Sequence, residues 1–252
     1  MVGAIHRPAP PGVIDVFDLA DLRGIAAGPD GVRIGAATTY ADLLASDLVR
    51  RELPILHRAA REIGAAQIQE RGTLGGNVAT SSPVGDTLPV LLALDATVEL
   101  ASTRGPRRVP YAGFTTGYRR TALGPDELVA AILLPRRSPG QVDFWRKVGT
   151  RRAQAISKVV VAASAVLEGG RLRNVRLAMG AVADRPIRLA RSEALLEGAR
   201  PDPEIAQRLA AEVRAEIRPI SDVRSTREYR LETAARLAAR WILDLLGPAA
   251  RR

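Results

Sequence analysis

Two long apolar runs of β-type residues, at 156–167 and 172–182, restrict the fold more than any other feature of this sequence. They flank Gly169–Gly170, a dipeptide typical of a hairpin turn. Helical patterns follow the hairpin at three places, which are residues 191–197, the stretch after Asp202 and Pro203, and residues 225–246. The second half of the chain is therefore predicted to be a small antiparallel sheet with three helices packed on it.

The first half alternates strand and helix signals along its length. Strands are predicted at 32–36, 97–101, 108–111 and 127–134, and helices at 40–46, between 53 and 63, and at 88–94. Thr38 or Thr39 is expected to cap the first of these helices, and Thr87 the last, because a hydroxyl accepts a hydrogen bond from an unpaired helical N–H. Together the two halves predict an α+β fold.

The length of 252 residues suits one large domain or two modest ones. The Pro- and Arg-rich segment 135–140 is typical of a linker, so we expect two domains, 1–140 and 141–252. No apolar stretch approaches the roughly 20 residues that cross a bilayer. The first twelve residues carry no secretory pattern, and we expect a cytoplasmic protein without a transmembrane segment.

Composition excludes several kinds of chemistry. The chain has no cysteine, which rules out disulfides, thiolate metal sites and iron–sulfur ligation within it. Two histidines leave little room for a histidine-based metal site or a catalytic triad. We expect neither a metal site nor a catalytic acid or base in this chain.

The net charge of +10 comes almost entirely from arginine, since only two of the 37 basic residues are lysine. The arginines are spread along the chain and aromatic residues make up only 4%, which argues against nucleic-acid binding. Genomic base composition accounts for such an excess. A basic face that docks an acidic partner subunit is the other interpretation.

The densest chemical signal is the glycine-rich segment 72–77, followed by 81–86. Glycines let successive backbone amides point into one concavity, and such a nest suits the oxygens of a pyrophosphate. Thr73 and Asn77 would add side-chain hydrogen bonds, and Asp86 would accept from ribose hydroxyls. The alternative is a tight turn made by the two adjacent glycines. The spacing matches neither a dinucleotide-fold fingerprint nor a phosphate-binding loop.

A longer pattern surrounds this segment and consists of Gln67, Ile68, Arg71, Gly72, Thr73, Leu74, Gly75, Gly76, Asn77, Ser82, Pro83, Asp86 and Pro89. It resembles the second FAD-binding motif of the flavoprotein (medium) subunits of molybdenum hydroxylases, such as carbon monoxide dehydrogenase and xanthine dehydrogenase. Segments 34–39, 147–159 and 221–230 are similar to the same subunits, in the same order and spacing. The resemblance runs from about Val13 to the C-terminus.

This resemblance implies an FAD-binding lobe of the vanillyl-alcohol oxidase-like (PCMH) type and an electron-transfer subunit. Its partners would be a molybdenum-cofactor subunit and a [2Fe-2S] subunit, in a dimer of heterotrimers. The residues implied are Thr73, Leu74, Gly75, Gly76 and Asn77 at the pyrophosphate, Asp86 at the ribose, Val129 near the flavin and Lys147 beside the isoalloxazine. A surface lysine at a domain edge is the alternative for Lys147. A non-catalytic assembly subunit without FAD, and a stand-alone FAD-dependent reductase, are the alternative functions.

One departure from the family concerns the start of the chain. The family has an earlier motif, roughly Ala-Gly-Gly-Thr-x-Leu, which supplies the other half of the pyrophosphate clamp, and this sequence has no such motif. We therefore expect an N-terminally shortened chain that binds FAD poorly when expressed alone. Apolar residues around Val13, Val16, Phe17 and Leu19 are then expected to be exposed.

Overall fold

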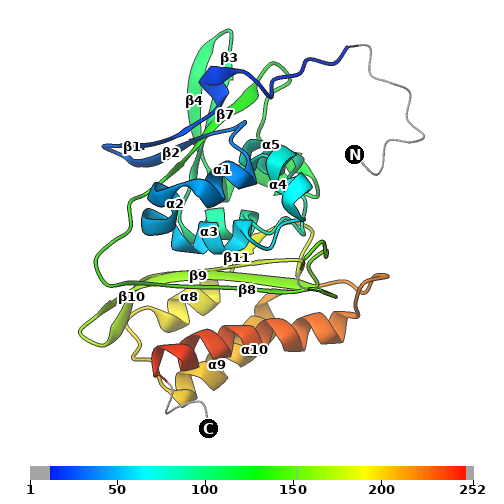
Figure 1. Ribbon diagram of the computed structural model, residues 1–252. Coiled ribbons are helices and arrows are strands. Elements are labelled where there is room, and N and C mark those ends of the chain that lie inside the picture. The colour runs from blue at the N-terminus through cyan, green and yellow to red at the C-terminus, as the bar shows by residue number, and fades with distance from the viewer. Residues whose placement is uncertain (1–11, 152, 248–252) are drawn as a thin grey trace.

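The computed structural model describes residues 12–151 and 153–247. Figure 1 shows a five-stranded antiparallel sheet at one end of the molecule, then a layer of short helices, a four-stranded antiparallel sheet and a layer of helices at the other end. The strand orders are β1-β2-β7-β3-β4 and β11-β10-β9-β8, and β5 and β6 form a separate ribbon. This arrangement confirms the α+β fold.

The strands are β1 Ile25–Gly28, β2 Gly31–Gly35, β3 Thr97–Ser102, β4 Gly105–Pro110, β5 Thr115–Gly117, β6 Arg120–Thr121, β7 Leu128–Leu134, β8 Gln141–Val148, β9 Val159–Glu168, β10 Arg171–Gly180 and β11 Ile187–Arg188. The helices are a 3-10 turn at Ala20–Leu22, α1 Tyr40–Ala45, α2 Asp47–Glu52, α3 Pro54–Ala60, α4 Ala66–Arg71, α5 Leu74–Thr80, α6 Leu88–Ala93, α7 Tyr111–Phe114, α8 Ala190–Leu196, α9 Pro203–Glu216 and α10 Arg227–Leu245.

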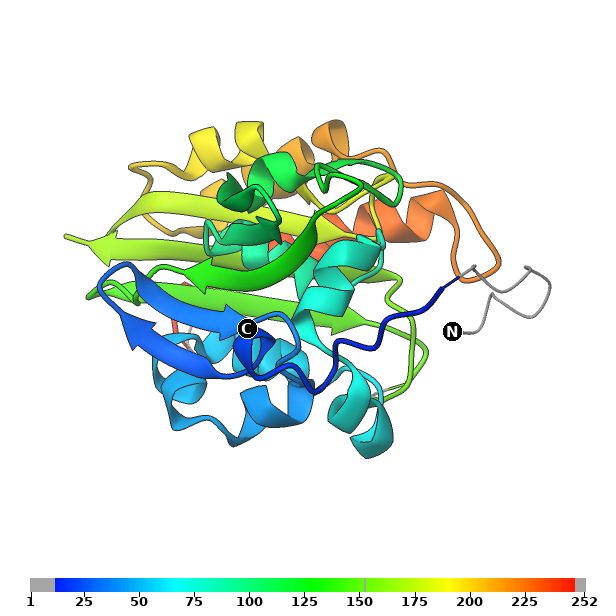
Figure 2. The same cartoon turned by 90° about the horizontal axis from the view of Figure 1, so that it is seen from above.

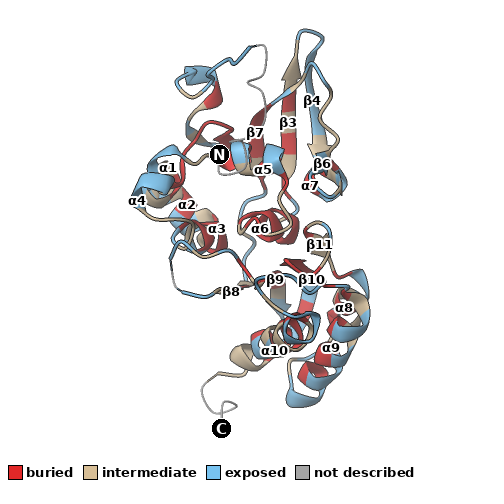
Figure 3. Cartoon of the chain, turned by 90° about the vertical axis from the view of Figure 1, so that its right-hand side faces the viewer, coloured by how far each residue is buried: buried red, intermediate tan, exposed pale blue. Residues whose placement is uncertain are grey.

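The hairpin of β9 and β10 is buried on both faces. Val160 and Ala162 of β9 belong to the core of the first half, whereas Val159 and Val161 belong to the core under α9 and α10. Helix α6 packs on one face of these strands and α10 on the other, and Figure 3 shows buried residues on both sides. The apolar runs in the sequence are continuous because one sheet serves two cores.

The three helices predicted for the second half are present as α8, α9 and α10, and two of them have side-chain caps. The Asp202 carboxylate accepts from the Ile205 N–H at 2.7 Å, and Pro203 occupies the first turn of α9. The Thr226 hydroxyl accepts from the Tyr229 N–H at the start of α10. Of the two caps only Asp202 was predicted, and it acts on an N–H three residues away; α8 begins without a side-chain cap.

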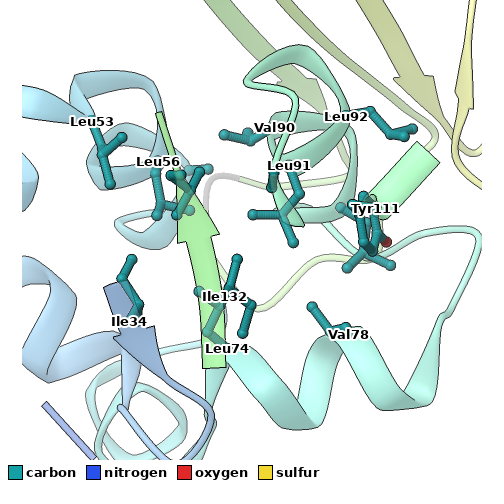
Figure 4. Packing of buried hydrophobic residues seen from close by; sticks show 14 of the residues in the cluster. Ile34, Leu53, Leu56, Leu74, Val78, Val90, Leu91, Leu92, Tyr111 and Ile132 are labelled. Carbon is teal, nitrogen blue, oxygen red and sulfur yellow. The ribbon is translucent and has the colours of Figure 1, made fainter. Parts of the chain in front are cut away.

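The structure differs from the predictions in several elements, and those that were not predicted include β1, α2, α4, α7, β5, β6 and β11. The helix predicted between 53 and 63 ends at Ala60, because the Gln69 side chain donates to the carbonyls of Ala60 and Ile63. The strand β8 was not predicted, since charged residues interrupt its apolar pattern. The glycine-rich segment lies in α5, which packs on β7. Figure 4 shows Leu74 of this helix against Ile132.

The described start of the chain lies along the outside of the first half. Val13 is 81% exposed and Leu19 is 50% exposed, and Val16 is also exposed, which confirms the expected apolar surface there. Phe17 is half-buried because the Arg71 guanidinium lies 4.2 Å from its ring centre. Seen from above in Figure 2, this start and the segment between α9 and α10 project to the same side of the molecule. No helix within the described ranges is long and apolar enough to span a membrane.

Candidate functional site

The glycine-rich segment does not form the predicted nest of outward-facing amides. The Leu74 N–H donates to the Thr38 carbonyl at 3.1 Å, and the Gly75 N–H donates to the Ala36 carbonyl at 2.9 Å. The Gly76 N–H donates to the Thr73 hydroxyl oxygen at 3.0 Å, so Thr73 caps α5. The predicted nest is absent because Thr73 caps a helix that starts at Leu74 and packs on β7, and the first amides of this helix are used internally.

The two adjacent glycines have different surroundings. A Cβ added at Gly75 would lie 2.4 Å from the Ala36 Cβ and 2.6 Å from its carbonyl oxygen, so a close approach of two backbones requires this glycine. A Cβ at Gly76 would meet only the Thr73 hydroxyl oxygen within 4 Å, and Gly76 is exposed. Gly75 therefore positions α5, and Gly76 leaves an open surface beside Thr73.

The Asn77 side chain is oriented by Thr87, a residue expected from the sequence to cap α6. The Thr87 hydroxyl donates to the Asn77 Oδ1 at 2.6 Å. Thr87 is the N-cap residue of α6, as predicted, but its hydroxyl makes no capping bond to this helix. The Tyr40 hydroxyl lies beside Thr87, and burial raises the pKa of Tyr40. With Oδ1 occupied, the amide Nδ2 lies next to Gly85 and has no acceptor in the described part of the chain.

Asp86 and Lys147 form a buried ion pair. The Lys147 Nζ lies 2.6 Å from Asp86 Oδ2, and it also donates to the Glu62 carbonyl at 3.2 Å. The side chains are only 3% and 10% exposed, so Lys147 is not a surface lysine and that alternative was wrong. Burial raises the pKa of Asp86, and the Lys147 ammonium opposes this rise.

Ser157 is the third member of this group, and no site role was predicted for it from the sequence. Its hydroxyl donates to Asp86 Oδ1, and its side chain is fully buried. A single hydroxyl among apolar residues is the only sequence signal for such a role. Val129, in contrast, lies in β7, the strand on which α5 packs, and is buried in the core of the first half.

Three donors remain without an acceptor among the described residues: the Thr73 hydroxyl proton, the Asn77 Nδ2 and one N–H of Lys147. Thr73 caps the helix that carries Asn77, and the Asn77 amide approaches Gly85. Gly85 precedes Asp86, which pairs with Lys147, so the three donors belong to neighbouring groups. Phosphate and ring oxygens are acceptors, so this donor set fits a flavin dinucleotide.

A pocket of about 790 Å³ opens next to residues 82–84. Its lining combines apolar side chains with arginines and includes Val84, Tyr118, Ile220, Arg119, Arg218 and Arg224. Tyr118 and Ile220 are largely exposed at 64% and 71%. This pocket has no signal in the sequence, because its walls come from segments as far apart as residues 82–84 and 218–224.

Comparisons with known proteins agree with this arrangement. Residues 5–137 match the family described as FAD binding domain in molybdopterin dehydrogenase, and residues 145–245 match the CO dehydrogenase flavoprotein C-terminal domain. The glyceraldehyde dehydrogenase medium chain of Sulfolobus acidocaldarius is 34% identical, over 89% of this chain and 79% of that protein. The xanthine dehydrogenase FAD-binding subunit of Escherichia coli is 33% identical, over 94% of this chain and 82% of that protein.

A solved structure has the same fold. One chain of the reconstituted CO dehydrogenase from Oligotropha carboxidovorans superposes with a TM-score of 0.84 at 29% identity, covering 88% of this chain and 77% of that chain. Both halves of the sequence thus match flavoprotein domains, and the fold matches a dehydrogenase chain. The chain therefore belongs to the FAD-binding medium subunits of the molybdenum hydroxylases, the family that includes carbon monoxide dehydrogenase and xanthine dehydrogenase.

Proposed function

We propose that this chain carries electrons from an iron–sulfur subunit through FAD to an external acceptor, as one subunit of a molybdenum hydroxylase. The observation that carries the proposal is the group of unused donors on Thr73, Asn77 and Lys147 within a matched FAD-binding domain. Bound FAD supplies the redox chemistry. The chain has no cysteine to hold an iron–sulfur cluster, so the clusters belong to a partner.

We assign the site residues as follows. The Thr73 hydroxyl and the Asn77 amide bind pyrophosphate oxygens, and Gly76 leaves room for them. Lys147 directs its remaining N–H toward the flavin ring, where a cation favours the negative reduced form. Asp86 holds Lys147 and keeps lone pairs for a ribose hydroxyl. The other residues of the site position these groups: Leu74 and Gly75 anchor α5, and Val129 supplies an apolar contact near the flavin.

The same proposal covers domains and assembly. We place the two domains at 1–140 and 141–252, a division supported by the end of β7 at Leu134 and the start of β8 at Gln141. The similarity to medium subunits supports a molybdenum subunit and an iron–sulfur subunit as partners, and we propose a dimer of such heterotrimers. The cytoplasmic location stays a prediction of the sequence.

Purification from the native host tests the proposed function. We expect this chain to copurify with two further polypeptides, together with molybdenum, iron and flavin absorbance. A chain that is active by itself would contradict the proposal and would favour a stand-alone reductase. A complete complex without flavin absorbance would instead identify a non-catalytic assembly subunit.

Thr87→Val is expected to weaken FAD binding about fivefold without unfolding the protein. The variant removes the donor that orients Asn77, and one hydrogen bond to a ligand-binding group is worth roughly 1 kcal/mol. Thr38→Val is the matched control, because Thr38 is equally buried and its hydroxyl donates to the Gly24 carbonyl instead. Fluorescence titration with FAD measures both variants. Equal losses in the two would show that Thr87 has no special role toward Asn77.

We infer that the external acceptor enters the pocket beside residues 82–84. The lining carries four arginines against the two carboxylates of Asp184 and Asp222, and this excess of positive charge, together with the exposed Tyr118 ring, suits an anionic acceptor with a planar ring. Arg119→Gln is expected to raise the KM for an anionic dye acceptor about two- to fivefold, because the variant loses the free energy of one exposed ion pair. Oxygen reduction is expected to stay unchanged. Arg208→Gln changes an equally exposed arginine on α9 and is the control. An equal effect of both variants would contradict the assignment.

A further inference from the structure

We propose that Ser157 is a positioning residue for the flavin: its hydroxyl fixes the Asp86 carboxylate, which in turn fixes the Lys147 ammonium. The inference rests on the proposed placement of FAD beside Lys147, and it adds a residue outside the glycine-rich motif. Ser157 touches neither the proposed pyrophosphate donors nor the pocket, so its effect must pass through Asp86.

One carboxylate connects three separate segments of the chain. Asp86 lies between α5 and α6, Lys147 lies on β8, and Ser157 lies just before β9. Asp86 Oδ2 is 2.6 Å from the Lys147 Nζ, and Oδ1 accepts from the Ser157 hydroxyl. Because each oxygen has a donor from a different segment, the carboxylate cannot rotate without losing one of the two bonds.

The backbone around Ser157 is itself anchored. The N–H of the next residue, Lys158, donates to the Val148 carbonyl at 2.7 Å. The Lys158 carbonyl accepts from the buried guanidinium of Arg230, also at 2.7 Å. The backbone at Ser157 is therefore held in place, and the Ser157 hydroxyl holds the Asp86 carboxylate through a hydrogen bond. Burying a hydroxyl is unfavourable unless it is hydrogen-bonded, and Asp86 is its only bonding partner within the described ranges.

The position of Asp86 decides where Lys147 presents its free N–H. An ammonium group has three donors in a fixed tetrahedral arrangement. Asp86 accepts from one and the Glu62 carbonyl from a second, which sets the direction of the third. The Ser157 hydroxyl also withdraws charge from Asp86, so more of the Lys147 charge acts on the flavin. Both effects stabilise the reduced, negative flavin more than the oxidised one.

The experiment compares Ser157→Val with Ser157→Thr in the FAD-loaded complex. The two side chains have nearly the same shape, and only threonine keeps the hydroxyl. In Ser157→Val we expect oxidised FAD to bind about threefold more weakly and reduced FAD about 30-fold more weakly. This tenfold difference corresponds to a two-electron midpoint potential about 30 mV lower. In Ser157→Thr we expect the wild-type potential. Spectroelectrochemical titration at about pH 8, where carboxylates are ionised, gives the potentials.

Ser192→Ala is the matched structural control. Ser192 is also fully buried, and its hydroxyl donates to the Glu216 carboxylate at 2.8 Å in the core under α9. We expect it to lower thermal stability and to leave the flavin potential unchanged. A Ser157→Val complex that loses stability but keeps the wild-type potential overturns the positioning role. Ser157→Ala, measured in the same way, replaces Ser157→Val if the larger side chain prevents folding.

The failure of the proposed function has a different signature. A wild-type complex without FAD would overturn the proposed function and this inference together. A shifted potential in Ser157→Val, together with a Lys147→Met complex that keeps FAD at the wild-type potential, would leave FAD binding intact and overturn the route through Lys147.

Discussion

Lys147→Met is expected to lower the free energy of unfolding by about 3–5 kcal/mol and to abolish retention of FAD. The substitution leaves the buried Asp86 carboxylate without its counter-ion, which costs far more than the loss of an exposed ion pair. It also removes the cation proposed to lie beside the flavin. Urea unfolding of the FAD-free chain measures the first effect, and flavin absorbance after gel filtration measures the second.

A double variant separates stability from cofactor binding. Lys147→Met combined with Asp86→Leu removes both charges, and replacing a buried pair by apolar residues is often neutral for stability. We expect the double variant to regain most of the lost stability and still to release FAD. If the single variant lost less than about 1 kcal/mol, the pair would behave as an exposed one and the buried geometry would be wrong.

The stability of the Lys147→Met variant should depend on pH in a defined direction. Burial raises the pKa of Asp86, and without Lys147 only the hydrogen bond from Ser157 opposes that rise. A carboxyl whose folded pKa lies above its unfolded value of about 4 binds protons more tightly when folded. Its contribution is therefore fully present below the unfolded pKa and is lost as the pH rises through the folded pKa. We expect the deficit relative to wild type to be smaller at about pH 5 than at about pH 8.

Gly75→Ala is expected to lower the free energy of unfolding by about 1–3 kcal/mol or more, because the new methyl group overlaps the Ala36 backbone. The clash is with a carbonyl group that also accepts the Gly75 N–H, so α5 must shift away from β2 and its connecting residues. FAD affinity should fall with stability, since the same helix carries Asn77. Chemical unfolding with and without FAD measures both effects.

Gly76→Ala is the control for this prediction. Its methyl group would meet only the Thr73 hydroxyl, and alanine favours a helix over glycine by up to about 1 kcal/mol. We expect little change in stability and weaker FAD binding, because the methyl group covers the open surface beside Thr73. If both variants unfolded equally, packing would not distinguish the two glycines. If neither lost stability, the close approach at Ala36 would be wrong.

Patterns that act over a few residues were readable from the sequence. The hairpin of β9 and β10 follows from two apolar runs around a glycine pair, and Gly169 and Gly170 both have positive φ, at 56° and 74°. The start of α9 follows from Asp202 and Pro203, because a cap acts on an N–H three residues away. The family resemblance located the FAD-binding segment and the C-terminal domain, both of which the comparisons match.

The tertiary structure decided how the glycine-rich segment is used. Glycines permit both a turn and a close helix packing, and their spacing does not distinguish the two. In the folded chain Gly75 packs against Ala36. The amides of Leu74 and Gly75 donate to the carbonyls of Thr38 and Ala36, so they do not belong to a ligand-binding nest. A sequence shows which positions lack a Cβ. It does not show which neighbouring atom occupies the space that a Cβ would fill.

By itself the sequence determined the α+β class, the hairpin with its following helices, and the type of cofactor, because these depend on local patterns and on a motif of fixed spacing. Only the tertiary structure paired Asp86 with Lys147, 61 positions away, and with Ser157, 71 positions away. Such pairs carry no sequence signal, since burial and the meeting of distant segments create them. A lysine that looked like a surface residue or a lone flavin contact is instead one part of a buried three-residue group, because the desolvated ammonium requires a counter-ion.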